Sequence, residues 1–502
     1  MSRKILVADL LCGAGGSSTG CRRALADLGF DMDLVCVNHW PTAIETHKRN
    51  HPEARHYVQD IATVRPHLLV PEGYLDLLMA SPTCTHHSVA RGGKPTSDQQ
   101  RSDPWHIITW LTELRVKRII IENVWEFTGW GPVDPRTGRP VASRKGEYFQ
   151  AWTATLQRLG FELEWRKLNA ADYGDATTRQ RFILIGRSDG CKLRWPMPTH
   201  RRRSEIGDSL FSDALPWRPA RDIIDWSIKG KSIFNRPKAL APKTIARIYN
   251  GAVKEGWPEP YLVILRNHMS ARGLDLPLPT IAANGTHIGL AEPVIMNGRK
   301  GNQAKAVSTD PIPTLDTKGG VWLAEPLVLS QHNSGAPRPV GDPIPTVTTG
   351  GNGAAHALIS PYYGSGSGET CVGVSEPLPT VTSKARFGMV APVTHRDGSD
   401  RARDVSEPLP TITGANRGEL AFVAGTDRYD ILFRMLEPHE LAAAMGFIGD
   451  GETYEFAGTK TDQIKQIGNA VSVAMMRAVV GALMADAPPR QEVEAEWREA
   501  AE

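Results

Sequence analysis

The first 124 residues alternate between strand-like and helix-like stretches, and this alternation constrains the fold more than any other feature. Apolar-rich runs lie at 4–11, 32–38, 56–61, 75–79 and 118–124, several have polar residues at or just after their ends, and helix-like stretches separate some of them. Strands that alternate with helices form a parallel sheet with helices on both faces. The sequence therefore predicts an α/β fold with a Rossmann-like, doubly wound, mostly parallel sheet.

Polar side chains follow several of these predicted strands. They are Asp9, Asp60, Cys84, Glu122 and Asn123. Ligands of doubly wound sheets bind beyond the carboxyl ends of the strands. We therefore expect these side chains to form a site, although an acid in such a place can also cap the next helix.

The first predicted strand leads into CGAGGSSTG, where Gly13, Gly15 and Gly16 precede a helix-like stretch. Glycines at such a turn let the backbone approach a nucleotide cofactor. Their spacing differs from GxGxxG, the fingerprint of pyrophosphate binding. An adenosine cofactor without a pyrophosphate fits this turn better than NAD or FAD.

Cys84 lies in a loop rich in Pro, Thr, His and Gly, directly after the apolar run 75–79. Arg91 and Lys94 follow in the same loop and would favour a thiolate. The alternative is a buried packing cysteine, because free thiols usually serve as small hydrophobic side chains. The loop alone leaves both interpretations open.

The chain has 502 residues, of which 41% are hydrophobic, and this suffices for the cores of more than one domain. The sequence has no apolar run of roughly 18 residues and no signal-peptide pattern. The six cysteines lack CxxC or Cys/His spacing, which predicts neither disulfides nor a zinc site. We expect a cytoplasmic protein that binds no metal and no membrane.

Basic residues are concentrated in the middle of the chain. Residues 191–250 contain 13 Lys and Arg against 5 Asp and Glu, although the whole chain has a formal net charge of only +3. Such a stretch suits a polyanionic partner. A solvated basic face explains the same composition, so the charge alone decides nothing.

The middle of the chain also contains a repeat. The phrases LPLPTI, DPIPTL, DPIPTV, EPLPTV and EPLPTI place threonines at 280, 314, 346, 380 and 411, with spacings of 34, 32, 34 and 31 residues. A nearly fixed period indicates an array of similar units, which bury their faces by stacking on neighbours. We expect one β-hairpin-like unit per repeat, with the prolines at edge or turn positions.

Six motifs together resemble the ordered series of the DNA cytosine-5 methyltransferases. They are DLLCGAGGSSTG, the cysteine after a proline-containing turn, ENV, RQRFILIG, RMLEPHELAAAMGF and QIGNAVSV. The resemblance covers roughly residues 4–187 and 426–485, with a long variable segment before the last two motifs. It implies a class I methyltransferase fold and S-adenosylmethionine as cofactor.

The resemblance also implies catalytic roles. Cys84 would be the nucleophile that adds to cytosine C6, and Glu122 would protonate or share a proton with N3. Asn123 and Arg181 would orient Glu122, and Arg179 would contact the base edge or a phosphate. The target base would be extruded from the duplex, beside the loop of Arg91, Gly92 and Gly93.

The residues that would bind S-adenosylmethionine in such a family member are Asp9, Gly13, Gly15, Gly16, Asn38, His39, Trp40, Asp60, Ile61 and Asn469. The chain departs from the family pattern at four places. Asn38-His39 stands where the family has an acid for the ribose, Leu11 replaces an aromatic residue, Thr83 replaces a proline, and Thr177 replaces a glutamine. These departures concern the geometry of the cofactor site more than the reaction.

We expect a catalytic domain at 1–190, a mainly β, repeat-containing DNA target-recognition region at 191–425, a C-terminal return at 426–487 and an acidic tail at 488–502. The expected protein is a prokaryotic or phage-encoded monomer that methylates double-stranded DNA, with or without a restriction partner.

Three other functions stay open. One is an RNA-directed enzyme, and a second is a DNA-binding relative without catalysis. The third is cytosine-5 modification with an altered donor or product, suggested by the hydroxyl of Thr83 and the absent acid at Asn38-His39.

Overall fold

A computed structural model of the protein describes most of the chain outside the Cys84 loop and the later repeats. The described residues are 4–82, 103–134, 136, 140–206, 214–233, 236–255, 260–266, 269, 271–297, 431–449 and 451–487, with short strands between 305 and 423. Cys84, Thr83, Arg91, the last four repeat phrases and the tail at 488–502 lie outside them. The chain forms two compact units: unit 1 (1–225, 275–286 and 436–502) and unit 2 (226–274 and 287–435).

Unit 1 is built on a seven-stranded sheet with the order β3-β2-β1-β5-β7-β9-β8. The pairs from β3 to β7 are parallel, and β9 runs antiparallel to both β7 and β8. The strands are β1 (Lys4–Leu10), β2 (Asp31–Asn38), β3 (Arg55–Val58), β5 (Leu77–Ala80), β7 (Arg118–Asn123), β8 (Glu162–Asn169) and β9 (Gln180–Arg187). The predicted Rossmann-like, mostly parallel sheet is confirmed.

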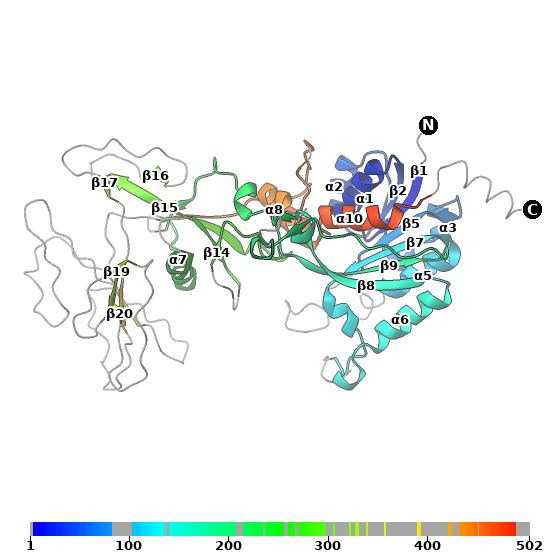
Figure 1. Ribbon diagram of the computed structural model, residues 1–502, viewed down its shortest axis with the longest axis horizontal. Helices are drawn as coiled ribbons and strands as arrows, with labels where there is room; N and C mark the ends of the chain where they lie inside the picture. Colours follow the sequence, from blue (N-terminus) through cyan, green and yellow to red (C-terminus); the bar gives the residue numbers. More distant parts are fainter. Residues whose placement is uncertain are drawn as a thin grey trace, which may run out of the picture. The chain divides into compact units, whose positions relative to one another are not determined.

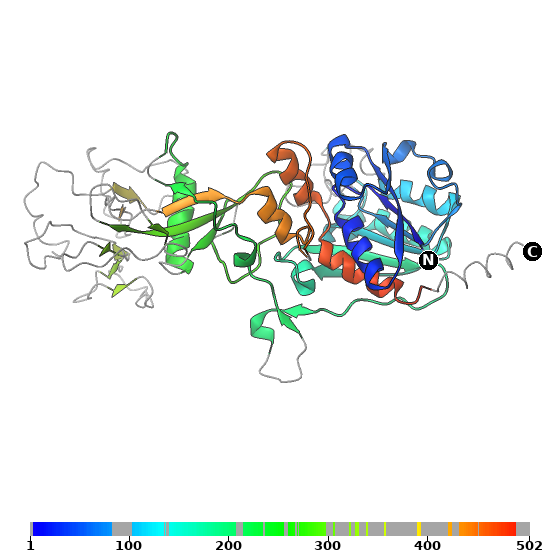
Figure 2. The same ribbon diagram turned by 90° about the horizontal axis from the view of Figure 1, so that it is seen from above.

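Helices cover both faces of this sheet, because the side chains of a strand alternate between its two sides. In β1, Ile5 and Val7 pack in the core under α1 and α10, whereas Leu6 and Ala8 pack in the core under α5 and α6. Figures 1 and 2 show α1 and α10 side by side on one face. The helices of unit 1 are α1 (Gly16–Asp27), α2 (Pro41–Asn50), α3 (Pro66–Leu69), α5 (Asp103–Glu113), α6 (Glu147–Arg158), α8 (Pro438–Ala444), α9 (Lys460–Asn469) and α10 (Val473–Met484).

Shorter elements complete unit 1. Two pairs of two-residue strands are parallel, β4 (Tyr74–Leu75) with β6 (Arg115–Val116) and β10 (His200–Arg201) with β11 (Leu215–Pro216). The 3₁₀ helices are η1 (Ile61–Thr63), η3 (Trp125–Gly129), η4 (Ala142–Arg144), η5 (Ala170–Tyr173), η6 (Arg203–Glu205) and η7 (Ala220–Ile223).

Unit 2 contains an antiparallel sheet packed against one helix, α7 (Pro242–Glu255). Its main path is β12 (Lys231–Ser232), β23 (Ile431–Met435), β15 (Ile288–Asn297), β13 (Tyr261–Ile264) and β14 (Arg272–Gly273). Ile248 of α7 packs with Tyr261 and Phe433 in its core. The other described strands are β16 (Lys305–Ala306), β17 (Val321–Trp322), β18 (Leu327–Ser330), β19 (Arg338–Pro339), β20 (His356–Ala357), β21 (Met389–Pro392) and β22 (Leu420–Val423).

The segment Lys460–Met484 is long and apolar enough to cross a membrane by length and composition, and 67% of its most apolar window is buried inside the structure. Two helices, α9 and α10, make up this segment. Ala470 breaks the helical path with an extended backbone, and Ser472 caps α10 by accepting a bond from the Met475 amide. Because α10 packs against α1, its hydrophobicity is explained by the core of unit 1.

Candidate active site

The parallel strands of unit 1 end at one edge of the sheet, and four of the polar residues predicted from sequence lie there: Asp9, Asp60, Glu122 and Asn123. Leu10 pairs with Ala80, and Ala80 pairs with Ile121, so β1, β5 and β7 end close to one another. β1 lies between β2 and β5, which makes this the point where the chain reverses its order across the sheet. Crevices that bind ligands form at such switch points.

The glycine turn after β1 adopts a backbone that side chains disfavour. Gly13 and Gly15 have φ of 55° and 90°, and Leu11 has φ of 60°. A Cβ at Gly13 would meet nothing within 4 Å, whereas a Cβ at Gly16 would lie 2.3 Å from the carbonyl oxygen of Val471. The turn is therefore open at Gly13, where a cofactor could approach, and closed at Gly16 by the C-terminal segment.

Asp9 lies fully buried beneath this turn. Its Oδ2 accepts a hydrogen bond from the Ser18 hydroxyl at 2.6 Å, and its Oδ1 has no hydrogen-bond partner within the described residues. Burial raises the pKa of Asp9 from 3.8 to about 7, although Ser18 opposes the change. An unsatisfied buried oxygen beside an open glycine turn fits a polar cofactor group, which supports the expected S-adenosylmethionine site.

The raised pKa of Asp9 predicts how the free energy of unfolding depends on pH. Below pH 3.8 the carboxyl is protonated in both states, and between pH 4 and 7 the unfolded chain ionises first, so the folded state loses stability as pH rises. Asp9→Asn should raise the free energy of unfolding at pH 8 by at most about 4 kcal/mol, and by much less at pH 5. Urea unfolding at both pH values measures this. The exposed Asp31→Asn is the control, and an equal effect of Asp9→Asn at the two pH values would contradict the assignment.

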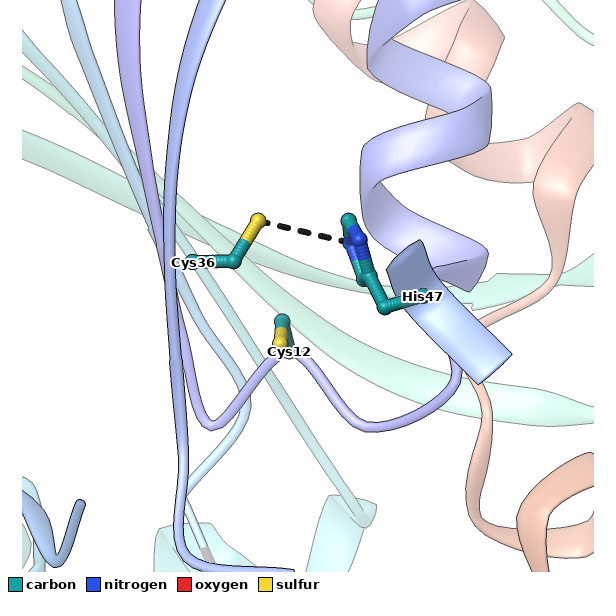
Figure 3. Close-up of side chains that lie close together, drawn as sticks. All are labelled: Cys12, Cys36 and His47. Atoms are coloured by element: carbon teal, nitrogen blue, oxygen red, sulfur yellow. Dashed lines mark hydrogen bonds between the residues drawn. The ribbon is translucent and has the colours of Figure 1, made fainter. Parts of the chain in front are cut away.

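Two cysteines and a histidine form a buried cluster at the glycine turn, and Cys12 lies on the turn itself (Figure 3). The ligand atoms of Cys12, Cys36 and His47 lie within 4.8 Å of one another, and Cys36 Sγ lies 3.4 Å from His47 Nε2. Burial raises the pKa of both thiols and lowers that of His47. All three groups are therefore neutral near pH 7, and His47 also contacts Ser18, at 2.9 Å, and His56. These three side chains therefore pack together as buried, neutral groups beside the turn.

Asn38, His39 and Trp40 follow β2 at the same edge. Asn38 is buried, and its Oδ1 accepts a hydrogen bond from the Trp40 amide at 2.9 Å. His39 is exposed, and the ammonium of Lys465 lies 4.4 Å from the centre of the Trp40 ring. The side-chain amide of Asn38 therefore shapes the turn before Trp40, within the Asn38-His39 pair that stands where the resemblance implies an acid.

Asp60 and Ile61 follow β3. Asp60 is exposed and caps η1, because its Oδ1 accepts from the Ala62 amide at 3.0 Å. Ile61 is buried in the sheet core. Asp60 therefore caps a helix in this structure, as the alternative interpretation predicted. Its side chain is also exposed, so a ligand could reach the carboxylate.

The C-terminal segment returns to the glycine turn. Asn469 ends α9 and is exposed, and Val471 two residues later contacts Gly16. Tyr454, which the sequence analysis did not single out, donates a hydrogen bond to the carbonyl of Ala14. Residues more than 430 positions apart in sequence thus build one wall of the turn.

Glu122 lies near the end of β7 and is buried. Arg181 on the neighbouring strand β9 places its Nε 3.0 Å from Glu122 Oε1. Burial raises the pKa of Glu122, although Arg181 and Arg179 both act to lower it. A buried carboxyl group with a raised pKa, held by a guanidinium at a strand end, suits a proton donor.

Asn123 connects Glu122 to the segment before Cys84. Its side-chain amide donates to the carbonyl of Pro82 at 3.0 Å, and its Oδ1 accepts from the Val124 amide at 2.8 Å. Pro82 is the last described residue before the loop, and Cys84 lies outside the described residues. Asn123 therefore holds the entrance of the Cys84 loop beside Glu122.

Arg179 is buried and bonds the protein backbone, and its expected contact with a base edge or phosphate stays a prediction. Its Nη1 donates to the carbonyl of Ile281 at 3.2 Å, in the first repeat phrase. Sequence analysis did not foresee this long-range contact. The only sign in the sequence that this segment matters was that the phrase LPLPTI is repeated.

The chain matches the family of C-5 cytosine-specific DNA methylases over residues 5–210 and 392–485. These two segments include β1, the glycine turn, Glu122 and the C-terminal return described above. The chain belongs to this family.

Among curated proteins, the type II methyltransferase M1.HphI of Haemophilus parahaemolyticus is 28% identical over 40% of this chain and 51% of its own length. The type II methyltransferase M.AgeI of Thalassovita gelatinovora is 29% identical over 43% of this chain and 49% of its own. The chain thus spans about half the length of these relatives. Among solved structures, a methyltransferase of Entamoeba histolytica covers 97% of this chain at 10% identity, with a TM-score of 0.47.

Proposed function

We propose that this protein transfers a methyl group from S-adenosylmethionine to C5 of cytosine within a specific double-stranded DNA sequence. The observation that carries the proposal is the Glu122 arrangement. A buried carboxyl group with a raised pKa lies 3.0 Å from Arg181, and the adjacent Asn123 bonds the chain two residues before Cys84. A carboxyl and a thiol in one pocket are what cytosine-5 chemistry requires.

The proposed reaction assigns a bond change to each group. The Cys84 thiolate forms a bond to C6 of cytosine while N3 takes up the Glu122 proton, and C5 becomes nucleophilic. C5 then forms the new carbon–carbon bond, and the methyl–sulfur bond of the donor breaks to leave a neutral thioether. A base removes the C5 proton, the C6–sulfur bond breaks, and the N3 proton returns to Glu122.

S-adenosylmethionine supplies the electrophilic methyl group when it is bound. Asp9 and the open backbone at Gly13 would hold its polar methionine part, and Asn38 or His39 would bond the ribose hydroxyls through neutral groups in place of an acid. The exposed carboxylate of Asp60 would accept from the adenine amino group. The unsatisfied Oδ1 of Asp9 supports this arrangement.

We further propose that residues 191–425 include the surface that recognises DNA. The concentration of Lys and Arg at 191–250 supports phosphate contact, and the array of repeats supplies candidate elements for base contact. The target base would rotate out of the duplex to reach Cys84 and Glu122. The protein would act as a monomer on DNA in the cytoplasm.

Expression in a host without cytosine methylation of its own tests the function. We expect its DNA to gain 5-methylcytosine at defined sequences, read by deamination sequencing and by mass spectrometry of nucleosides. A different modified cytosine would favour the altered donor or product suggested by Thr83. Methyl transfer to RNA alone, or to nothing, would contradict the proposal.

A further inference from the structure

Two thiols and an imidazole from three different elements of unit 1 meet at one place. Cys12 lies on the glycine turn, Cys36 on β2 and His47 on α2. Their ligand atoms lie within 4.8 Å of one another, and all three side chains are buried. Figure 3 shows Cys36 and His47 facing each other, with Cys12 beside them. Thiolates and an imidazole are the usual protein ligands of zinc and of similar soft ions.

The spacing of these atoms suits a tetrahedral ion. A zinc ion binds sulfur at about 2.3 Å and nitrogen at about 2.0 Å, so its ligand atoms stand about 3.6 to 3.8 Å from one another. Cys36 Sγ lies 3.4 Å from His47 Nε2. The Ser18 hydroxyl lies 2.9 Å from the same nitrogen and offers an oxygen for the fourth position. Small movements of these side chains would therefore close the cluster around an ion.

His56 holds His47 in the orientation that a metal ligand needs. Its Nε2 lies 2.9 Å from His47 Nδ1, and His56 donates a second hydrogen bond to the backbone of Ala54. When His47 Nδ1 donates a hydrogen bond to His56, the lone pair of His47 Nε2 faces Cys36. Histidine ligands in metal sites almost always have such a partner on the other ring nitrogen. The cluster thus has an outer partner as well as three ligands.

The charge of a divalent ion suits this buried place. Two thiolates carry two negative charges and one divalent ion balances them, so the filled site would be neutral overall. A neutral unit avoids the high free-energy cost of an unpaired charge away from water. An ion would enter from the glycine turn, because Gly13, next to Cys12, is open: a Cβ there would meet nothing within 4 Å.

We propose that Cys12, Cys36 and His47 bind one divalent, thiophilic metal ion of the zinc class, which joins the glycine turn to β2 and α2. On binding, two S–H bonds break, two metal–sulfur bonds and one metal–nitrogen bond form, and the two protons pass to the solvent. This inference does not depend on the proposed function. It revises the expectation of no metal, which rested on a local spacing that these ligands do not share.

Titration of the full-length protein with Cd²⁺ tests the site, because cadmium binds thiolates as zinc does and its thiolate complexes absorb in the ultraviolet. A competing chelator is present, so that single exposed thiols such as Cys191 do not register. We expect one Cd²⁺ to bind per protein, with release of about two protons. The unfolding temperature should rise, since the ion favours the folded state. Zn²⁺ should compete for the same site.

Cys12→Ala and Cys36→Ala should each weaken Cd²⁺ binding by more than about 100-fold, because each removes a thiolate ligand. His56→Ala should weaken it by about 10- to 100-fold, since it removes only the outer partner of His47. Cys21→Ala is the matched control, because Cys21 is a free, buried cysteine in the same core but outside the cluster. It should bind Cd²⁺ as the wild type does. Thermal unfolding without metal shows whether each variant folds.

X-ray absorption of the Cd²⁺-loaded wild type keeps the test decisive if the alanine variants fail to fold. Two sulfur ligands and an imidazole nitrogen would support the site, and any other set of protein ligands would overturn it. Wild-type protein that binds no Cd²⁺ would overturn it too. Unchanged binding in folded Cys12→Ala, or an equal loss in Cys21→Ala, would place the ion elsewhere with the same result. All of these outcomes leave the proposed methyl transfer standing.

Discussion

Replacement of Cys84 by alanine is expected to abolish methyl transfer, because no other group would add to C6 and make C5 nucleophilic. DNA that carries 5-fluorocytosine at the target should trap the wild-type protein, since fluorine at C5 cannot leave as a proton does. The wild type should form a covalent complex that survives denaturation, and Cys84→Ala should form none. Gel electrophoresis of labelled DNA under denaturing conditions measures this.

Cys191→Ala is the control for this experiment, because Cys191 is a free, exposed cysteine of unit 1. It should trap DNA as the wild type does. An adduct that persists in Cys84→Ala would show that another residue is the nucleophile. Loss of the adduct in Cys191→Ala with Cys84 intact would equally contradict the assignment.

The architecture of unit 1 could be predicted because its sequence pattern is local. The consecutive residues 5–8 of β1 are all apolar, and their side chains point alternately to the two faces of the sheet. This is expected of a strand covered on both faces, and the structure buries all four. The glycine turn directly follows such a strand, and Glu122 lies near the end of another. Because parallel strands have their carboxyl ends at the same edge of a sheet, the position of both features at that edge could be predicted once the sheet was predicted to be parallel.

The long-range contacts of unit 1 could not be predicted in this way. Arg179 meets Ile281 across about one hundred positions of sequence, and Gly16 meets Val471 across more than four hundred. No local periodicity encodes such pairs, because they depend on the path of the chain through both units. For the same reason, cysteine spacing gave no sign that Cys12, Cys36 and His47 would lie together, since three different elements bring them there.

Glu122→Gln is expected to lower the rate of methyl transfer by about 10²- to 10⁴-fold, the usual contribution of a positioned proton donor. The amide of glutamine keeps the shape of the carboxyl and a donor hydrogen, but it cannot transfer a proton to N3. Glutamine keeps the shape of the buried carboxyl but removes the ion pair with Arg181, so the unfolding temperature should fall modestly while the protein still folds. Single-turnover rates and thermal unfolding measure the two effects.

The pH dependence of these rates separates a proton donor from a residue that only positions others. The pKa of Glu122 is raised, so its protonated form persists above the ordinary range of a carboxyl, and the wild-type rate should fall as pH rises through that raised pKa. Glu122→Gln should lack this decline, because its amide does not titrate. Glu126→Gln, an exposed acid on η3, should keep both the wild-type rate and the decline. If Glu122→Gln kept the same decline at a similar rate, the proton would come from another group, and Glu122 would serve only to hold Arg181.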